Sequence, residues 1–401
     1  MRNKKYILSG DRVLWVALAL LSIFSFLPVF SASSNLTYVV GQGTPWSHLL
    51  KHFIVLFFGF GLMYALHKTP YQYFKGISIL ALPLIILLLI YTATQGNLIA
   101  GANANRWIRI PIVGLSFQTS TLASIVLLAY VAHLLSKDNP KIYQLKTSIL
   151  SLWLPVLLVV LLILPANLST AVLLFFMVLI LVFLGGYPTK YLMGILVMGL
   201  FMSLIFVLVA KAYPDWVPNR IDTWVSRIEN FNNKEGGGGN YQIERAKTAI
   251  ATGGLLGLGA GKSVMKNFLP QSSSDFIYAI IVEEFGLIGG TALILLYLIV
   301  LFRIVVIAHK SDTVYGKLLV LGLGLPIVIQ AFVNMAVALQ VLPVTGQTLP
   351  LISSGGTAAW MTCIAFGIIL SVSAGQKTEP TDPNPSEDKN ENPLSILSET
   401  L

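Results

Sequence analysis

The stretch that decides the fold is LPQSSSDFIYAIIVEEFG, residues 269–286, where a polar loop runs into a long apolar segment that still carries three carboxylates. Pro270 and the serines after it favour a turn and a helix start, so Asp275 is expected in the first turn of a helix, within reach of water. Glu283 lies eight residues further, on nearly the same helical stripe and about 12 Å deeper. Glu284 faces nearly the opposite way.

Two interpretations of these carboxylates remain open on spacing alone. In the first, Ser274 or Asp275 only caps the helix, while Glu283 and Glu284 pair with basic groups inside a helix bundle. In the second, the carboxylates are functional, because ionisable side chains within membrane segments are costly and usually face a cavity or a partner.

The composition indicates a membrane protein. Of 401 residues, 55% are hydrophobic and 11% are charged, and the mean hydropathy is +0.78. An ordinary soluble domain of this size does not have such values. The fold is therefore predicted to be that of an all-α polytopic membrane protein. The single cysteine, Cys363, lies in an apolar segment, so it excludes an internal disulfide and is interpreted as a small core residue.

Apolar stretches of spanning length predict about ten transmembrane helices. They lie at 13–33, 47–66, 76–94, 118–135, 147–164, 169–186, 190–211, 275–308, 318–341 and 357–374. The first follows several basic residues and is interpreted as an uncleaved helix rather than a signal peptide. The fifth and sixth are separated only by residues 165–169, so a re-entrant pair is the alternative there.

Basic residues are unevenly distributed over the short connections between these helices. One side carries Lys68, Lys75, Lys137, Lys141, Lys146, Lys190, Arg303, Lys310 and Lys317, and the other carries Arg106, Arg109 and Lys51. Because Lys and Arg favour the cytoplasmic side, both termini are predicted to be cytoplasmic, with a large extracytoplasmic loop, about 212–274, between helices seven and eight. Residues 1–375 form the membrane domain, and the polar tail 376–401 is predicted to be disordered and cytoplasmic.

The outer loops mix arginine with tryptophan, which is typical of a membrane interface. Arg106 and Arg109 are three residues apart, so on a helical turn they would face one side and could clamp a diphosphate; the alternative is that they bind lipid headgroups. Residues 221–231 have apolar side chains at three- and four-residue spacing, which predicts an amphipathic helix anchored in the outer interface.

The glycine-rich run at 253–263 ends in Lys262 and Ser263. Its spacing is not that of a Walker A loop, and no strand precedes it. The glycines would let the backbone approach a ligand closely, or let Lys262 reach one, and the alternative is simple loop flexibility.

Three ordered motifs resemble those of the FtsW/RodA family, the SEDS proteins of bacterial cell-wall synthesis. They are Asn105-Arg106-Trp107 followed by Ser116-Phe117-Gln118; Leu269-Pro270 followed by Asp275-Phe276-Ile277, Glu283-Glu284 and Gly286; and Pro343, Thr345-Gly346, Leu349-Pro350, Ile352-Ser353 and Gly355-Gly356. The resemblance spans nearly the whole membrane portion and is more FtsW-like than RodA-like.

The resemblance implies a ten-helix peptidoglycan glycosyltransferase of the bacterial cytoplasmic (inner) membrane that polymerises lipid II on the outer face and releases undecaprenyl diphosphate. It implies a class B penicillin-binding protein and other divisome or elongasome membrane proteins as partners, and no nucleic acid. The family's catalytic carboxylate matches Asp275. A lipid II flippase, or a scaffold without chemistry, remains as the alternative.

The chain departs from the family pattern at several polar positions. Many relatives have Pro-Glu-Ala-His-Thr-Asp where this chain has residues 270–275, so the extra Glu and His are absent. Relatives often carry Glu and Lys at the positions of Thr121 and Ser124. Asn167 replaces a family Asp, and Ser354 a Tyr. Losing Glu and Lys together avoids leaving one buried charge unpaired.

Transfer of a sugar from a lipid diphosphate needs a base and positive charge near the leaving group. Asp275 is the predicted base, or the ligand of a divalent cation such as Mg or Mn, since magnesium accepts a single carboxylate together with substrate phosphates. Predicted substrate-binding residues are Arg106, Arg109, Lys262, Tyr241, Gln242 and Arg245. Predicted structural or cavity residues are Glu283, Glu284, Ser353, Gly355, Gly356, Thr121 and Ser124.

Overall fold

In the computed structural model of this protein, the described residues are 8–38, 43–94, 98–99, 102–103, 107–109, 116–137, 143–212, 231, 241–269 and 271–376. Arg106 lies outside them. So do the predicted amphipathic helix of the large loop, apart from Phe231, and the tail beyond Gln376.

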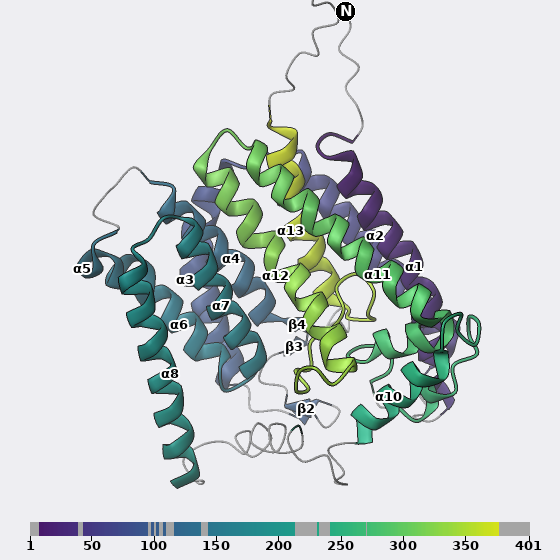
Figure 1. The fold of residues 1–401 in the computed structure, drawn as a ribbon. Coiled ribbons are helices and arrows are strands. Elements are labelled where there is room, and N and C mark those ends of the chain that lie inside the picture. Colours follow the sequence, from purple (N-terminus) through teal and green to yellow (C-terminus); the bar gives the residue numbers. More distant parts are fainter. Residues whose placement is uncertain are drawn as a thin grey trace, which may run out of the picture.

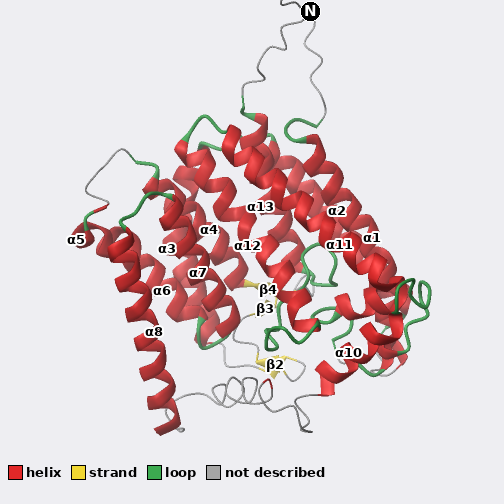
Figure 2. Ribbon diagram, viewed as in Figure 1, coloured by secondary structure: helices red, strands yellow, loops and turns green. Residues whose placement is uncertain are grey.

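Apolar helices make up most of the described chain (Figures 1 and 2). Seven are long and apolar enough to cross a membrane: α1 (Arg12–Tyr38), α2 (Pro45–His67), α3 (Tyr73–Thr94), the helical segment Leu145–Ile163, α11 (Ile277–Lys310), α12 (Val314–Ala338) and α13 (Thr357–Ala374). Three further apolar helices are α4 (Thr119–Leu135), α7 (Leu168–Leu184) and α8 (Thr189–Ala212). In the described part of the chain, these helices confirm the predicted all-α, multi-pass membrane architecture, and their number agrees with the prediction of about ten.

The fifth predicted helix is irregular for a local reason. It consists of α5 (Leu145–Ser148), a π-helical turn η2 (Ile149–Trp153) and α6 (Leu154–Ile163). Pro155 has no N–H to donate to the Ser151 carbonyl, and the Tyr130 hydroxyl donates to that carbonyl instead, at 2.8 Å. At 19 residues the segment can cross a membrane alone, which favours a full crossing over the re-entrant alternative.

The start of α1 and the end of α13 lie together, as an even number of crossings requires. A Cβ on Gly10 would stand 2.8 Å from the carbonyl oxygen of Leu370. Next to this contact, Asp11 caps α1 through the Leu14 amide at 2.8 Å and forms a salt bridge with Arg303 of α11. Both ends of the described chain therefore lie on one side of the bundle. That this side is cytoplasmic stays a prediction.

Helices α2 and α13 pack closely because small residues lie between them. A Cβ on Gly367 would stand 3.0 Å from the Met63 carbonyl oxygen, and one on Gly59 would stand 2.9 Å from Cys363 Sγ. Close backbone approach at small residues is a main source of helix association in membranes. Cys363 is 1% exposed, so it is a small core residue as predicted.

The opposite end of the bundle carries the short elements (Figure 1). They are the antiparallel pairs β1 (Leu98–Ile99) with β2 (Ala102–Asn103) and β3 (Trp107–Arg109) with β4 (Ser116–Gln118), the helix α10 (Tyr241–Gly253) and the 3-10 turn η4 (Met265–Asn267). Arg109 pairs with Ser116 across β3 and β4. Strand pairing extends the backbone at Arg109, so the helical turn on which Arg106 and Arg109 would face one side is not formed there.

Candidate active site

Asp275 lies in a turn that precedes α11 rather than inside the helix. α11 begins at Ile277 with Phe276 as its N-cap, and that residue makes no side-chain capping bond. Neither Ser274 nor Asp275 is therefore the N-cap residue of α11. The reason is that Gln271 adopts a φ of 58°, and the amides of Ser274 and Phe276 donate to its carbonyl at 3.0 and 3.4 Å. These bonds close a separate turn, on which Asp275 is half-buried.

A buried amide on α12 ties this turn to the loop that follows α12. Asn334 is 1% exposed, and its Nδ2 donates to the carbonyl of Asp275 at 2.8 Å and to that of Gln347 at 2.7 Å. A polar side chain in an apolar helix is costly to bury unless it is hydrogen-bonded. Asn334 was not predicted as a site residue, although a lone Asn within a spanning segment is a usable signal.

Two serines between α12 and α13 tie the same turn from another direction. Ser353 Oγ donates to the carbonyl of Ser274 at 2.6 Å. Ser354 donates to the carbonyl of Ser273 through its amide at 3.0 Å and its hydroxyl at 2.9 Å. In the family pattern, the positions of Ser273 and Ser354 have His and Tyr. The two residues that depart from the pattern are therefore in contact with each other.

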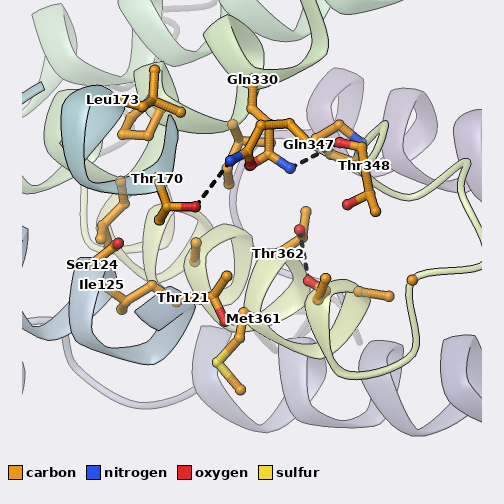
Figure 3. Close-up of a pocket in the computed structure, with 18 of the residues that line it drawn as sticks. Thr121, Ser124, Ile125, Thr170, Leu173, Gln330, Gln347, Thr348, Met361 and Thr362 are labelled. Carbon is orange, nitrogen blue, oxygen red and sulfur yellow. Dashed lines mark hydrogen bonds between the residues drawn. The ribbon is translucent and has the colours of Figure 1, made fainter. Parts of the chain in front are cut away.

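A cavity lies beside these ties, between α4, α7, α12 and α13 (Figure 3). It holds about 860 Å³ of empty space, including its open mouth. The polar side chains on its wall are Thr121, Ser124, Thr170, Gln330, Gln347, Thr348, Ser353 and Thr362. None of the described lining residues carries a charge. Because Ser353 belongs both to this wall and to the tie on Ser274, the cavity and the Asp275 turn share a boundary.

The other signature residues of this loop have separate places. Gly355 lines the cavity next to Ser353. Gly356 is the N-cap of α13 with a φ of 50°, a backbone conformation that favours glycine. The loop thus combines a cavity wall, a tie to the Asp275 turn and a helix start within four residues.

Thr121 and Ser124 face the cavity and bond back to their own helix (Figure 3). Thr121 Oγ1 donates to the Gln118 carbonyl and Ser124 Oγ to the Ser120 carbonyl, both at 2.9 Å. Such bonds satisfy hydroxyls without introducing charge.

The paired change Thr121→Glu with Ser124→Lys is expected to be less damaging than either single change. A lone charge in the bundle lacks a partner, whereas residues three apart on one helix face can meet. The measurement is the extracted yield and thermal stability of the three variants, with Ser124→Ala as the uncharged control. A double variant no better than the sum of the singles would mean that the cavity is built around the hydroxyls.

Glu283 is fully buried and holds the loop that leads to η4. Its carboxylate accepts the Ser263 hydroxyl and the amides of Val264 and Met265, at 2.9 and 3.1 Å for the amides. Glu283 therefore pairs with hydroxyl and amide donors. The expectation that it pairs with a basic group is wrong. Several such donors stabilise a buried carboxylate in place of a cation.

Glu284 is 1% exposed and faces α1. It accepts the Ser31 hydroxyl and, at 3.3 Å, the Ser263 amide. The Lys266 ammonium donates to the same Ser31 oxygen at 3.2 Å and to the Gly261 carbonyl at 2.7 Å. A basic group therefore reaches this carboxylate through Ser31. Glu283 and Glu284 together fasten the loop before Asp275 to α1 and α11.

The glycine-rich run packs against a break in α11. Gly286 has a φ of 68° and a ψ of −172° inside that helix. The amides of Leu287 and Leu258 donate to the carbonyls of Gly254 and Glu283 at 2.9 and 3.0 Å, so the run replaces helix bonds that the break removes. Simple loop flexibility is therefore the wrong interpretation of these glycines, because they allow backbone to contact backbone.

Of the predicted substrate-binding residues, the described structure brings together Tyr241, Gln242 and Arg245 on α10. Lys262 is exposed on the glycine-rich run. On α10, the Arg245 guanidinium stacks over the rings of Tyr241 and Phe268 at 4.9 and 5.8 Å, which are cation–π distances, and Gln242 is half-buried beside it. Only the backbone of Arg109 is described.

Asp275 is the single carboxylate predicted to hold a divalent cation. In the described part of the chain, no group of three or more His, Cys, Asp or Glu residues could hold a metal ion. A single carboxylate such as Asp275 suits Mg²⁺, which keeps several waters and takes substrate phosphates as further ligands. The residues present are therefore compatible with a cation that arrives with its substrate.

Fold and site define a multi-pass membrane protein with a carboxylate on a turn that Asn334, Ser353 and Ser354 hold beside a cavity whose described lining is uncharged. The family model described as "Cell cycle protein", for FtsW, RodA and SpoVE, matches residues 11–378. The chain therefore belongs to the FtsW/RodA/SpoVE family.

Individual relatives agree with this assignment. The chain is 32% identical over 384 residues to "Probable peptidoglycan glycosyltransferase FtsW" of Geobacter sulfurreducens, covering 94% of this chain and 99% of the relative. It is 30% identical over 381 residues to the protein of the same name from Coxiella burnetii, covering 92% and 98%.

Solved structures have the same fold. One, described as "Structural coordination of polymerization and crosslinking by a peptidoglycan synthase complex", is 26% identical with a TM-score of 0.70, over 92% of this chain and 99% of the other. The crystal structure of the rod shape determining protein RodA of Thermus thermophilus is 24% identical with a TM-score of 0.65, over 92% and 98%, and supports the fold alone.

Proposed function

We propose that this protein is a peptidoglycan glycosyltransferase that polymerises lipid II into glycan strands and releases undecaprenyl diphosphate. One observation carries the proposal: Asp275 lies on a turn tied by Asn334, Ser353 and Ser354 beside an uncharged cavity. The near full-length likeness to relatives named for this activity supports it.

The reaction needs a base at a fixed place. The Asp275 carboxylate takes the proton of the attacking sugar hydroxyl, the hydroxyl oxygen bonds to the anomeric carbon of the donor sugar, and the bond from that carbon to the diphosphate breaks. Asn334 and Ser353 donate to backbone carbonyls of the turn, and these bonds position the turn that carries the Asp275 carboxylate.

Positive charge must balance the departing diphosphate. Arg106 and Arg109 on the outer loop are the proposed clamp, and Lys262, Tyr241, Gln242 and Arg245 are further candidates. A divalent cation, Mg or Mn, held by Asp275 and the substrate phosphates would supply the same charge stabilisation.

The proposed setting is the bacterial cytoplasmic membrane, with both termini cytoplasmic and Asp275 on the outer face. A class B penicillin-binding protein is the proposed partner. Support comes from the charge distribution of the loops and from the structural neighbour, which belongs to a peptidoglycan synthase complex.

The arginine clamp makes a separate prediction. Arg106→Ala and Arg109→Ala are each expected to raise the KM for lipid II by roughly tenfold or more, because each removes a charge-assisted contact to the diphosphate. Initial rates over a range of lipid II concentrations measure this, with the exposed Lys247→Gln on α10 as the control. An unchanged KM in both arginine variants would assign them to lipid headgroups instead.

The proposed function itself is tested with purified protein and its class B partner in vesicles that contain lipid II. Strand formation and headgroup translocation are measured in the same sample. Polymer formation supports the enzyme. Translocation without polymer would identify a flippase, and neither activity would identify a scaffold.

A further inference from the structure

A cluster of aromatic and basic side chains lies at the end of the bundle opposite Asp275. Its centre is Tyr315, in the first turn of α12 and 1% exposed. The ring of Tyr71 stacks on that of Tyr315 at 6.2 Å, and the ring of His133, in the last turn of α4, meets it edge-on, also at 6.2 Å. A Cβ on Gly375 would stand 3.3 Å from the Tyr71 ring, so the cluster adjoins the end of α13.

Two buried polar atoms of this cluster have no hydrogen-bond partner among the described residues. They are the hydroxyl oxygen of Tyr315 and Nδ1 of His133. Buried polar groups are normally paired, so two unpaired ones side by side need an explanation. The Tyr315 hydroxyl can donate a hydrogen bond, and Nδ1 of His133 can donate in one of the two neutral tautomers. Both atoms can therefore bind an acceptor that the described chain does not supply.

Two lysines bring positive charge to the same place. The ammonium of Lys75, in the first turn of α3, lies 5.0 Å from the centre of the Tyr315 ring, and both Lys75 and Lys137 act electrostatically on the His133 ring. Among the described residues, neither lysine has a carboxylate within salt-bridge distance. Lysine donates hydrogen bonds and accepts none. The cluster therefore combines two cations with two neutral groups that can donate, and this combination is complementary to an anion.

The position of the cluster favours the phosphate of a lipid. Lys75, His133 and Tyr315 come from helix ends, where apolar segments meet the polar connections at the level of lipid headgroups. Phosphate oxygens are strong acceptors of charge-assisted hydrogen bonds. Basic pockets between transmembrane helices bind anionic headgroups in the same way. A choline headgroup would bring a further cation next to both lysines, so a zwitterionic lipid fits less well.

We propose that Lys75, Lys137, His133 and Tyr315 form a binding site for the phosphate of an anionic membrane lipid. The ring of Tyr315 holds the Lys75 ammonium, and its hydroxyl and the His133 ring are the neutral donors of the site. The site joins α3, α4 and α12 at the end of the bundle that does not carry Asp275. It is therefore independent of the proposed glycosyltransferase activity, and a bound lipid stabilises the folded protein.

The test uses purified full-length protein in a non-ionic detergent, titrated separately with phosphatidylglycerol, phosphatidylcholine and inorganic phosphate. The melting temperature reports binding, because a ligand of the folded state raises it. Phosphatidylglycerol is expected to raise it, and phosphatidylcholine is not. Lys75→Gln is expected to weaken phosphatidylglycerol binding by roughly tenfold. Tyr315→Phe, which keeps the ring and removes the hydroxyl, is expected to weaken it by a smaller factor.

Lys317→Gln is the matched control, because it removes the same charge from the same end of α12 at an exposed position outside the proposed site. It is expected to bind phosphatidylglycerol as the wild type does. Equal weakening by Lys317→Gln and Lys75→Gln overturns the site, because general attraction to surface charge then explains the binding. Stabilisation by inorganic phosphate with no preference for phosphatidylglycerol overturns the lipid assignment. If Lys75→Gln does not fold, Lys75→Arg, which is expected to retain binding, is compared with Tyr315→Phe.

Discussion

Asp275→Asn is expected to reduce glycan polymerisation by at least about a hundredfold while the protein stays folded. The amide preserves size but removes the base, and positioned general bases typically contribute 10²–10⁴-fold. Folding is expected to persist because the bonds from Asn334 and Ser353 go to the backbone carbonyls of Asp275 and Ser274, which the substitution leaves in place. Initial rates of lipid II consumption and the melting temperature measure the two effects.

Asp312→Asn is the control for this prediction. Asp312 is an exposed carboxylate in the connection between α11 and α12, at the opposite end of the bundle from Asp275. Its loss is expected to leave the rate unchanged. Near-normal polymerisation by Asp275→Asn would remove the catalytic assignment, whereas a fall in melting temperature with the rate would point to a structural role.

The largest expected effect on stability is that of Gly253→Ala. A Cβ at Gly253 would stand 2.1 Å from the Val282 carbonyl oxygen and 2.9 Å from the Glu283 Cα, so backbone must move. Overpacking of this kind costs about 1–3 kcal/mol or more. The first turns of α11, which follow Asp275, would shift, and both the extracted yield and the melting temperature are expected to fall.

Gly76→Ala in α3 is the matched control, because a Cβ there meets nothing within 4 Å. In a helix interior, Ala is preferred over Gly by about 0.8–1.0 kcal/mol. The control is therefore expected to be neutral or slightly stabilising. Equal behaviour of the two variants would contradict the account of the glycine-rich run as a rigid packing element.

The helices could be predicted from the sequence because spanning length and apolarity are local properties. The break at Gly286 could not, because it depends on the glycine-rich run folding back to supply hydrogen bonds from outside α11. The separate turn before Ile277 could not be predicted for a related reason. The positive φ of Gln271 closes a turn, and the hydrogen bond from Asn334 holds that turn in place. The Pro and Ser pattern alone predicts a helix start there.

The candidate site was predicted in part. The motifs located Asp275, and the departures at Thr121 and Ser124 indicated residues that the structure places on a cavity wall. The contacts between Ser354 and Ser273, and between Asn334 and the Asp275 turn, join segments about 60 to 80 residues apart, so no local pattern could place them. Only the fold shows that these polar positions surround one site.

Strand synthesis from lipid II by the purified protein, with its class B partner carrying an inactivated transpeptidase site, tests the central claim most directly. The account predicts glycan strands with the wild-type chain and none above background with Asp275→Asn at equal folded protein. Strands of equal length and amount from both chains would contradict it.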